Sequence, residues 1–323
     1  MKQPGTGNPE AQRMRHEPIE REGQRIENGV WRPKSLEAFR NEVAVGTTTK
    51  LTEIRKEGAG HTPRLRITGD ARRAIDDREE LEQALEGKMT IEEFRGKKVS
   101  AGLQLARTLE QLDPEADPRQ MIKTRLVHGT EIKVIDETYL AQAKKELVEI
   151  KADGLITNLK HIPLLAAAAD CAPVFIYDPE NRAIGIFHIG WRGTALEMPT
   201  KGVEAMEKAF GSNPSALRVV IGPYADGDNF ELSAGDKSSL MGAEGTRFSA
   251  EEEKLLFKTH KERGKILFDN GQAIAALLRK KGVLAEHIEI SAFSTIADND
   301  LLSSERREGF ANRDTLMAMA VLK

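Results

Sequence analysis

Short apolar runs alternate with charged, helix-like stretches along the chain from residue 121 onward. This alternation is typical of strands and helices that follow one another in an α/β domain. The apolar runs predict strands at 154–157, 172–177, 183–187, 217–221, 288–292 and 318–322. The charged stretches predict helices at 138–150, 196–210, 250–261 and 270–281. Ser249 followed by Glu252 predicts a capping box on the third helix, and Gly282 stands where the fourth helix should end.

The first third of the chain has a different texture. Residues 1 to about 30 mix both charge signs with Pro4, Pro9 and Pro18 and show hardly any apolar periodicity, so we expect a disordered or loosely attached arm. Residues 31–323 are expected to form a single α/β domain. Its part up to about residue 120 is strongly charged, with helix-like stretches only at 76–85 and 100–112.

Composition limits the partners of the protein. Hydrophobic residues make up 39% and charged residues 31% of the chain, which is typical of a globular protein with a charge-rich surface. The 48 basic residues are balanced by 51 acidic ones, so no overall field favours nucleic acid or an anionic membrane. No run is long enough to span a bilayer and no apolar signal core follows Met1, so a cytoplasmic location is expected.

Several common active-site motifs are missing from the sequence. It has no nucleotide phosphate loop, no His-Glu-x-x-His, no Cys-x-x-Cys pair and no Gly-x-Ser-x-Gly elbow. The single cysteine, Cys171, excludes an intramolecular disulfide. It is therefore a buried packing residue, a metal ligand or a nucleophile.

Cys171 precedes one predicted strand and His188 ends the next. The sequence between the strands, residues 178–182, is rich in turn formers and predicts an antiparallel hairpin. A hairpin centred on Pro179 and Glu180 places Cys171 directly opposite His188, close enough for both to bind one metal ion. An even-length loop centred one residue away makes the contact diagonal on the same face, whereas an odd-length loop puts the two side chains on opposite faces.

A third metal ligand would complete the site, and His128, next to Gly129, is favoured over His161. Two imidazoles and one thiolate leave one tetrahedral position open, as in catalytic zinc sites. The alternative is a buried cysteine and a hydrogen-bonded histidine without any metal.

Five motifs in this order are similar to those of one family, the laccase-domain or YfiH/YlmD-like proteins. They are Val-His-Gly-Thr at 127–130, Ala-Asp-Gly-Leu-Ile-Thr-Asn at 152–158, Ala-Asp-Cys-Ala-Pro-Val at 169–174, His-Ile-Gly-Trp-Arg-Gly at 188–193 and Ile-Gly-Pro at 221–223. The C-terminal Ser-Glu-Arg-Arg-Glu-Gly at 304–309, with Arg313, also resembles the family's ending. The resemblance covers residues 121–323 and implies a three-layer α/β/α sandwich with a mixed sheet.

The resemblance also implies a function. It places the family's zinc ligands on His128, Cys171 and His188, and implies phosphorolysis of adenosine, inosine or guanosine, with adenosine deamination by some members. The implied partners are a nucleoside and phosphate, with no nucleic acid or membrane; a protein partner is left open. Two departures are Ala168, where the family usually has Thr, and Tyr224, where it usually has Cys.

Zinc with an open position binds a phosphate oxygen or acidifies water, and further roles follow for residues near it. Arg192, Arg306 and Arg307 offer guanidinium groups to phosphate. Asp170 is expected either to orient a ligand histidine or accept a proton, or else to cap a turn. Trp191 is expected to stack on the base, or simply to pack.

Three alternatives remain at the level of sequence. Cys171 and His188 could form the nucleophile and base of a cysteine hydrolase. Copper oxidation of phenols needs several histidine-rich centres, which seven scattered histidines cannot build. A catalytically inactive binding module could keep zinc only as a structural ion.

Overall fold

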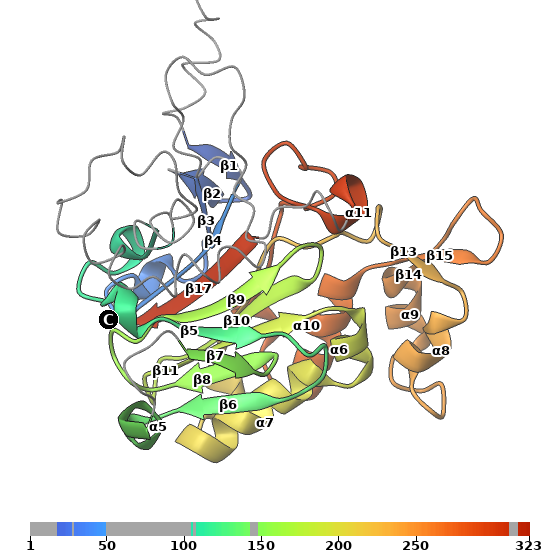
Figure 1. The fold of residues 1–323 in the computed structure, drawn as a ribbon. Coiled ribbons are helices and arrows are strands. Elements are labelled where there is room, and N and C mark those ends of the chain that lie inside the picture. The colour runs from blue at the N-terminus through green and yellow to red at the C-terminus, as the bar shows by residue number, and fades with distance from the viewer. Residues whose placement is uncertain (1–17, 28, 50–104, 106–107, 143–147, 310–315) are drawn as a thin grey trace, which may run out of the picture.

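The computed structural model describes residues 18–27, 29–49, 105, 108–142, 148–309 and 316–323 (Figure 1). The strands of these residues are β1 (Ile19–Arg21), β2 (Gln24–Glu27), β3 (Val30–Arg32), β4 (Val43–Thr48), β5 (Ile122–Arg125), β6 (Ile132–Ile135), β7 (Val148–Lys151), β8 (Gly154–Thr157), β9 (Leu164–Ala168), β10 (Ala172–Asp178), β11 (Ala183–Ile189), β12 (Arg218–Ile221), β13 (Glu231–Ser233), β14 (Phe257–Thr259), β15 (Lys265–Phe268), β16 (Ile288–Ile290) and β17 (Leu316–Leu322). The α-helices are α5 (Glu137–Gln142), α6 (Trp191–Ala195), α7 (Met198–Phe210), α8 (Asp236–Met241), α9 (Ala250–Leu256), α10 (Asn270–Lys280) and α11 (Glu305–Glu308). Short 3-10 turns are η1 (Glu37–Phe39), η4 (Pro118–Gln120), η5 (Pro214–Ala216) and η6 (Ala285–His287).

The strands form two mixed sheets and one small antiparallel sheet. The first has the order β1-β2-β3-β4-β17-β9-β5-β7. In it β17 is antiparallel to its neighbours β4 and β9, and β5 is parallel to its neighbours β9 and β7. The second has the order β16-β12-β10-β11-β8-β6, with an antiparallel centre and parallel outer pairs. The predicted α/β class with mixed pairing is confirmed, although the strands divide between two mixed sheets; the three-layer arrangement stays a prediction.

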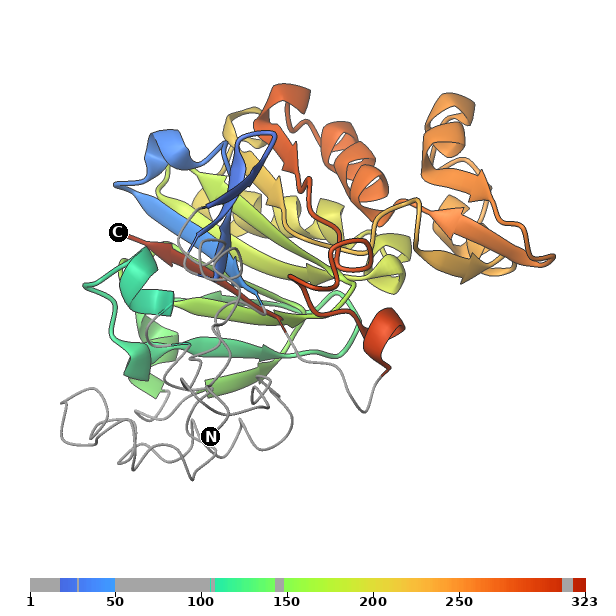
Figure 2. The same cartoon turned by 90° about the horizontal axis from the view of Figure 1, so that it is seen from above.

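The C-terminal strand β17 lies inside the eight-stranded sheet, between β4 and β9 (Figure 1). The three-stranded sheet, β13-β15-β14, lies with α8 and α9 at one end of the molecule, as Figures 1 and 2 both show. Residues 19–27, within the expected N-terminal arm, form β1 and β2 at the edge of the eight-stranded sheet. Residues 1–17 lie outside the described residues.

The core consists of separate apolar clusters on the faces of the sheets. One cluster joins the two mixed sheets and includes Trp31, Leu164 and Phe175. A second lies between the six-stranded sheet and helices α7 and α10. Strands β10 and β11 are buried along their whole length, which explains why their sequences are apolar apart from Asp178 and His188. No helix in the described ranges is long and apolar enough to cross a membrane.

Most predicted elements are confirmed. The predicted strands correspond to β8, β10, β11, β12, β16 and β17, and the capping box of Ser249 and Glu252 is present at α9. Two predicted helices extend too far: 138–150 ends as strand β7, and 250–261 ends as strand β14. Both segments pair with another strand: β7 with β5, and β14 with the following strand β15. This pairing outweighs local helix propensity. The stretch 76–85 lies outside the described residues, whereas residues 105 and 108–112 of the predicted helix 100–112 are helical.

Candidate active site

The hairpin of β10 and β11 carries two of the predicted ligands, and Asp178 fixes its turn. One carboxylate oxygen of Asp178 accepts hydrogen bonds from the backbone N–H groups of Glu180 (2.9 Å) and Asn181 (3.1 Å). The other accepts from the Asn181 amide at 2.9 Å. Asp178 pairs with Ala183 across the ladder, so the turn holds residues 179–182. The predicted antiparallel hairpin is therefore confirmed.

The register places Cys171 and His188 diagonally. His188 pairs with Pro173, so Cys171 lies two residues further along the same face instead of directly opposite. This is the even-loop alternative, centred one residue from the expected position. Continuing the register brings Cys171 opposite Gly190, where a Cβ atom would lie 2.6 Å from the Cys171 sulfur. Gly190 thus provides the space that the sulfur fills.

The buried carboxylate of Asp153 fixes the loop that carries His128. One oxygen accepts hydrogen bonds from the backbone N–H groups of Val127 (3.3 Å) and His128 (3.0 Å), and the other accepts from Gly129 at 2.7 Å. His128 adopts a positive φ of 57°, an uncommon conformation that these three bonds stabilise. Burial alone would raise the pKa of Asp153, but the adjacent His188 ring and the hydrogen bonds from the loop backbone lower it.

Asp153 also connects this loop to the hairpin. Its carbonyl accepts the backbone N–H of His188 at 2.7 Å, and its carboxylate lies 3.4 Å from the Nδ1 atom of the His188 ring. At this length Nδ1 has no close hydrogen bond and lies beside the carboxylate. Burial lowers the pKa of His188, but the Cys171 sulfur and the Asp153 carboxylate together raise it to about 9.

A cavity of about 170 Å³ lies over these side chains. The rings of His128 and His188 meet edge to face beside it, with centroids 5.2 Å apart. Its lining residues come from five parts of the chain: His128, Gly129, Ala169, Asp170, Cys171, His188, Gly190, Trp191, Arg192, Gly193, Phe230, Glu305 and Arg306. Among the described residues, no group of three or more His, Cys, Asp or Glu side chains has the spacing of a formed metal site.

Most of the predicted site residues therefore meet at this cavity. His161 does not: its Nδ1 atom pairs with the Asp113 carboxylate at 2.8 Å, away from the residues that line the cavity. Arg307 is also outside the lining set, and its backbone N–H caps α11 by donating to the Ser304 hydroxyl. Arg313 lies outside the described residues.

Asp170 holds three distant segments together. It has a φ of 77°, and its two carboxylate oxygens accept hydrogen bonds from the Thr295 hydroxyl (2.7 Å) and the Arg306 backbone N–H (2.9 Å). Its own carbonyl accepts the backbone N–H of Ala225 at 2.9 Å. These contacts favour the structural alternative for Asp170, in which it organises the loops around the cavity.

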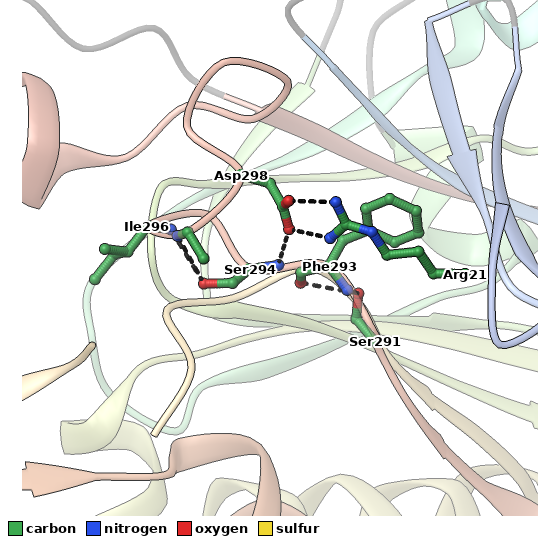
Figure 3. A network of polar contacts seen from close by, with 7 residues as sticks. Arg21, Ser291, Phe293, Ser294, Ile296 and Asp298 are labelled. Carbon is green, nitrogen blue, oxygen red and sulfur yellow. Dashed lines mark hydrogen bonds and ion pairs between the residues drawn. The ribbon is translucent and has the colours of Figure 1, made fainter. Parts of the chain in front are cut away.

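The segment that supplies Thr295 is itself tied to the N-terminal strand β1 (Figure 3). The two terminal guanidinium nitrogens of Arg21 each contact an oxygen of the Asp298 carboxylate at 2.6 Å, and the guanidinium lies over the Phe293 ring. Asp298 also accepts the backbone N–H of Ser294 at 2.9 Å. This segment therefore contacts β1 through Asp298 and Asp170 through Thr295.

The two arginines of the cavity each stack on an aromatic ring. The guanidinium carbon of Arg192 lies 4.5 Å from the Trp191 ring centroid, and that of Arg306 lies 4.4 Å from the Phe230 centroid. Helix α6, which carries the first pair, is fixed by the buried Asn270. The side-chain amide N–H of Asn270 donates to the Ile189 carbonyl at 2.9 Å, and the amide oxygen accepts from the Thr194 hydroxyl at 2.7 Å.

Sequence reasoning missed two residues of this site, Asp153 and Phe230. The signal for Asp153 was its place between Ala152 and Gly154, directly before a buried strand, where an acidic residue is costly to bury unless it has hydrogen-bond partners. Phe230 gave no local signal, because its role depends on Arg306, far away in the sequence.

Comparison with known proteins identifies the family. Residues 99–322 match the family model described as multi-copper polyphenol oxidoreductase laccase. The chain belongs to this family. The resemblance seen in the motifs is therefore confirmed.

Among the relatives is a Bacillus subtilis protein named purine nucleoside phosphorylase YlmD, 30% identical over 156 residues, or 48% of this chain. The match spans about half of that relative, 54% of its length. A Bacteroides thetaiotaomicron protein named purine nucleoside phosphorylase is 27% identical over 210 residues, covering 64% of this chain and 75% of the relative. The fold is similar to the crystal structure of the Bacillus licheniformis hypothetical protein YfiH, with a TM-score of 0.70 and 21% identity over 94% of this chain and 100% of that one.

Proposed function

We propose that this protein is a zinc-dependent purine nucleoside phosphorylase that acts on adenosine, inosine or guanosine. The observation that carries the proposal is the composition of one cavity, where His128, Cys171 and His188 adjoin the guanidinium groups of Arg192 and Arg306. The relatives named purine nucleoside phosphorylase support the same reaction.

The donor set suits zinc. Two imidazoles and one thiolate match three-ligand catalytic zinc sites, and Asp153 beside Nδ1 of His188 is the kind of carboxylate that orients a ligand histidine. When bound, zinc would supply an electrophilic centre for a phosphate oxygen. Copper oxidation is less well supported, because only two histidines line the cavity among the described residues.

In phosphorolysis a phosphate oxygen forms a bond to C1′ of the ribose while the bond from C1′ to the base breaks. The electron pair of that bond leaves with the purine, which then takes up a proton. Arg192 and Arg306 neutralise the phosphate and hold it near the sugar, since a guanidinium matches phosphate geometry. Asp170 keeps the Arg306 backbone in place through its hydrogen bond. Trp191 remains a candidate for contact with the base, with Arg192 over its ring.

Zinc binding is tested by elemental analysis of the metal-replete protein. Cys171→Ser, His128→Ala and His188→Ala should each lose most of the zinc. His161→Ala is the matched control, because His161 pairs with Asp113 outside the cavity lining. Wild-type zinc content in all three ligand variants would refute the assignment.

The reaction is tested with a panel of purine nucleosides, with and without phosphate, by chromatographic detection of free base and assay of ammonia. Base release that depends on phosphate supports the proposal. Ammonia without base release indicates adenosine deamination instead, and a silent protein with normal zinc content indicates a binding module. Retention of turnover without zinc and without phosphate would favour a hydrolase based on Cys171 and His188.

A further inference from the structure

Phe230 is a rigid part of the cavity wall. The residue is 8% exposed and belongs to an apolar cluster around the three-stranded sheet, together with Leu232, Phe268 and Ile296. Its backbone N–H donates to the Asp226 carbonyl at 2.9 Å, and its carbonyl accepts from Phe268 at 3.0 Å. Packing on one side and hydrogen bonds at both backbone groups therefore fix where the ring lies.

The ring in turn sets the position of the Arg306 head group. The guanidinium carbon lies 4.4 Å from the ring centroid, and both residues line the cavity. At its other end Arg306 is held by the hydrogen bond from its backbone N–H to Asp170. The exposed Arg306 is thus held both at its backbone and at its guanidinium group.

Stacking leaves the binding capacity of the guanidinium available. A cation–π contact uses the flat face of the group, whereas its N–H donors point outward in the plane. Glu305 also lines the cavity and carries a negative charge that disfavours an anion, so anion binding here needs cations held in place. The Trp191 ring packs against the same cluster and stacks with the Arg192 guanidinium in the same way.

We propose that Phe230 is a positioning residue for the anionic co-substrate, acting through the stacked guanidinium of Arg306. The inference rests on the proposed function for its reaction, but the anion contact itself can be measured without turnover. The relevant anion is inorganic phosphate. Phe230 would not contact it directly.

The test compares three variants. Phe230→Leu removes the aromatic face and keeps an apolar side chain, whereas Phe230→Tyr keeps the ring. Phe257→Leu is the matched control: its ring packs against the same cluster and has Lys237 above it at 5.0 Å, but it is outside the set of described residues that line the cavity. Affinity for inorganic phosphate is measured by calorimetry, and KM for phosphate and for the nucleoside is measured by turnover.

Phe230→Leu should weaken phosphate binding and raise the phosphate KM by about 2- to 5-fold, the usual size of an exposed cation–π contact. The nucleoside KM of Phe230→Leu should stay near the wild-type value. Phe230→Tyr and Phe257→Leu should keep a phosphate affinity and a phosphate KM near those of wild type. An unchanged phosphate affinity in Phe230→Leu, an equal loss in Phe257→Leu, or a wild type that binds no phosphate would overturn the inference. If phosphate binding follows the expected pattern but no nucleoside is turned over, the proposed function fails and the inference stands.

Discussion

Replacing Gly190 by alanine should disturb Cys171 specifically. Gly190 has a φ of −83° and so tolerates a side chain on backbone grounds. The obstacle is steric, because the new Cβ would lie 2.6 Å from the Cys171 sulfur. Gly193 in the same turn is the matched control, since its nearest neighbour would be 3.6 Å away.

The size of the effect follows from the overlap. Ordinary contacts between nonbonded heavy atoms begin at about 3.5 Å, so the Cβ atom and the sulfur would overlap by roughly 1 Å. Overpacking of this kind costs about 1 to 3 kcal/mol in the free energy of unfolding. Gly190 is also the N-cap residue of α6, where alanine is less favourable than glycine by up to about 1 kcal/mol. The two contributions must be separated.

A double-mutant cycle separates them. Gly190→Ala is measured by chemical denaturation in the metal-free protein, once with Cys171 present and once in a Cys171→Ala background. We expect about 1 to 2 kcal/mol of the cost to disappear when the sulfur is removed, and Gly193→Ala to cost little in either background. Thiol labelling should also show altered Cys171 reactivity in Gly190→Ala. Additive effects in the cycle, with unchanged labelling, would refute the steric argument.

Three further predictions concern charged residues of the site and its hairpin. Arg192→Ala should retain zinc but lose on the order of a hundred- to a thousand-fold in nucleoside turnover, since it removes a charge-stabilising donor; steady-state kinetics that match wild type would exclude that role. Asp153→Asn should cost about 2 to 4 kcal/mol in the free energy of unfolding, because an amide cannot accept all three backbone N–H groups at this buried position; a loss below 1 kcal/mol in denaturant titrations would contradict the prediction. Asp178→Ala should cost about 1 to 3 kcal/mol at neutral pH. Burial raises the pKa of Asp178, but the hydrogen bonds it accepts lower it overall, so its contribution is lost as the pH falls through that lowered pKa. The difference in the free energy of unfolding between wild type and Asp178→Ala should therefore narrow as the pH falls below about 3.9, the pKa of an unperturbed aspartate. A difference that stays constant over this range would contradict the prediction.

The sequence predicted well the parts of the fold that depend on local patterns. The hairpin, its turn and the capping box at Ser249 all follow from residues close together in the chain. The hairpin centre was misplaced by one residue, because turn residues alone do not specify the loop length when residues 178–182 all favour a turn. The even loop still kept Cys171 and His188 on one face.

Features that depend on strand pairing outside the segment itself were not predicted. Strand β7 exists because β5, far back in the sequence, lies beside it, and β14 exists because it pairs with the following strand β15. The roles of Asp153 and Asp170 likewise depend on which backbone groups the fold brings to their carboxylates. Among the arginines, the sequence could not tell Arg306 from Arg307, because neighbours on one short helix point in different directions.

The contacts of Asp170 have a consequence for how the site is assembled during folding. The hairpin that carries Cys171 and His188 closes a short loop, so this half of the site can form early and locally. Asp170, adjacent to it, bonds to Thr295 and Arg306 across 125 and 136 residues. The part of the cavity wall that carries Arg306 therefore forms only together with these long-range contacts. An excised hairpin would keep two of the donors without the cavity.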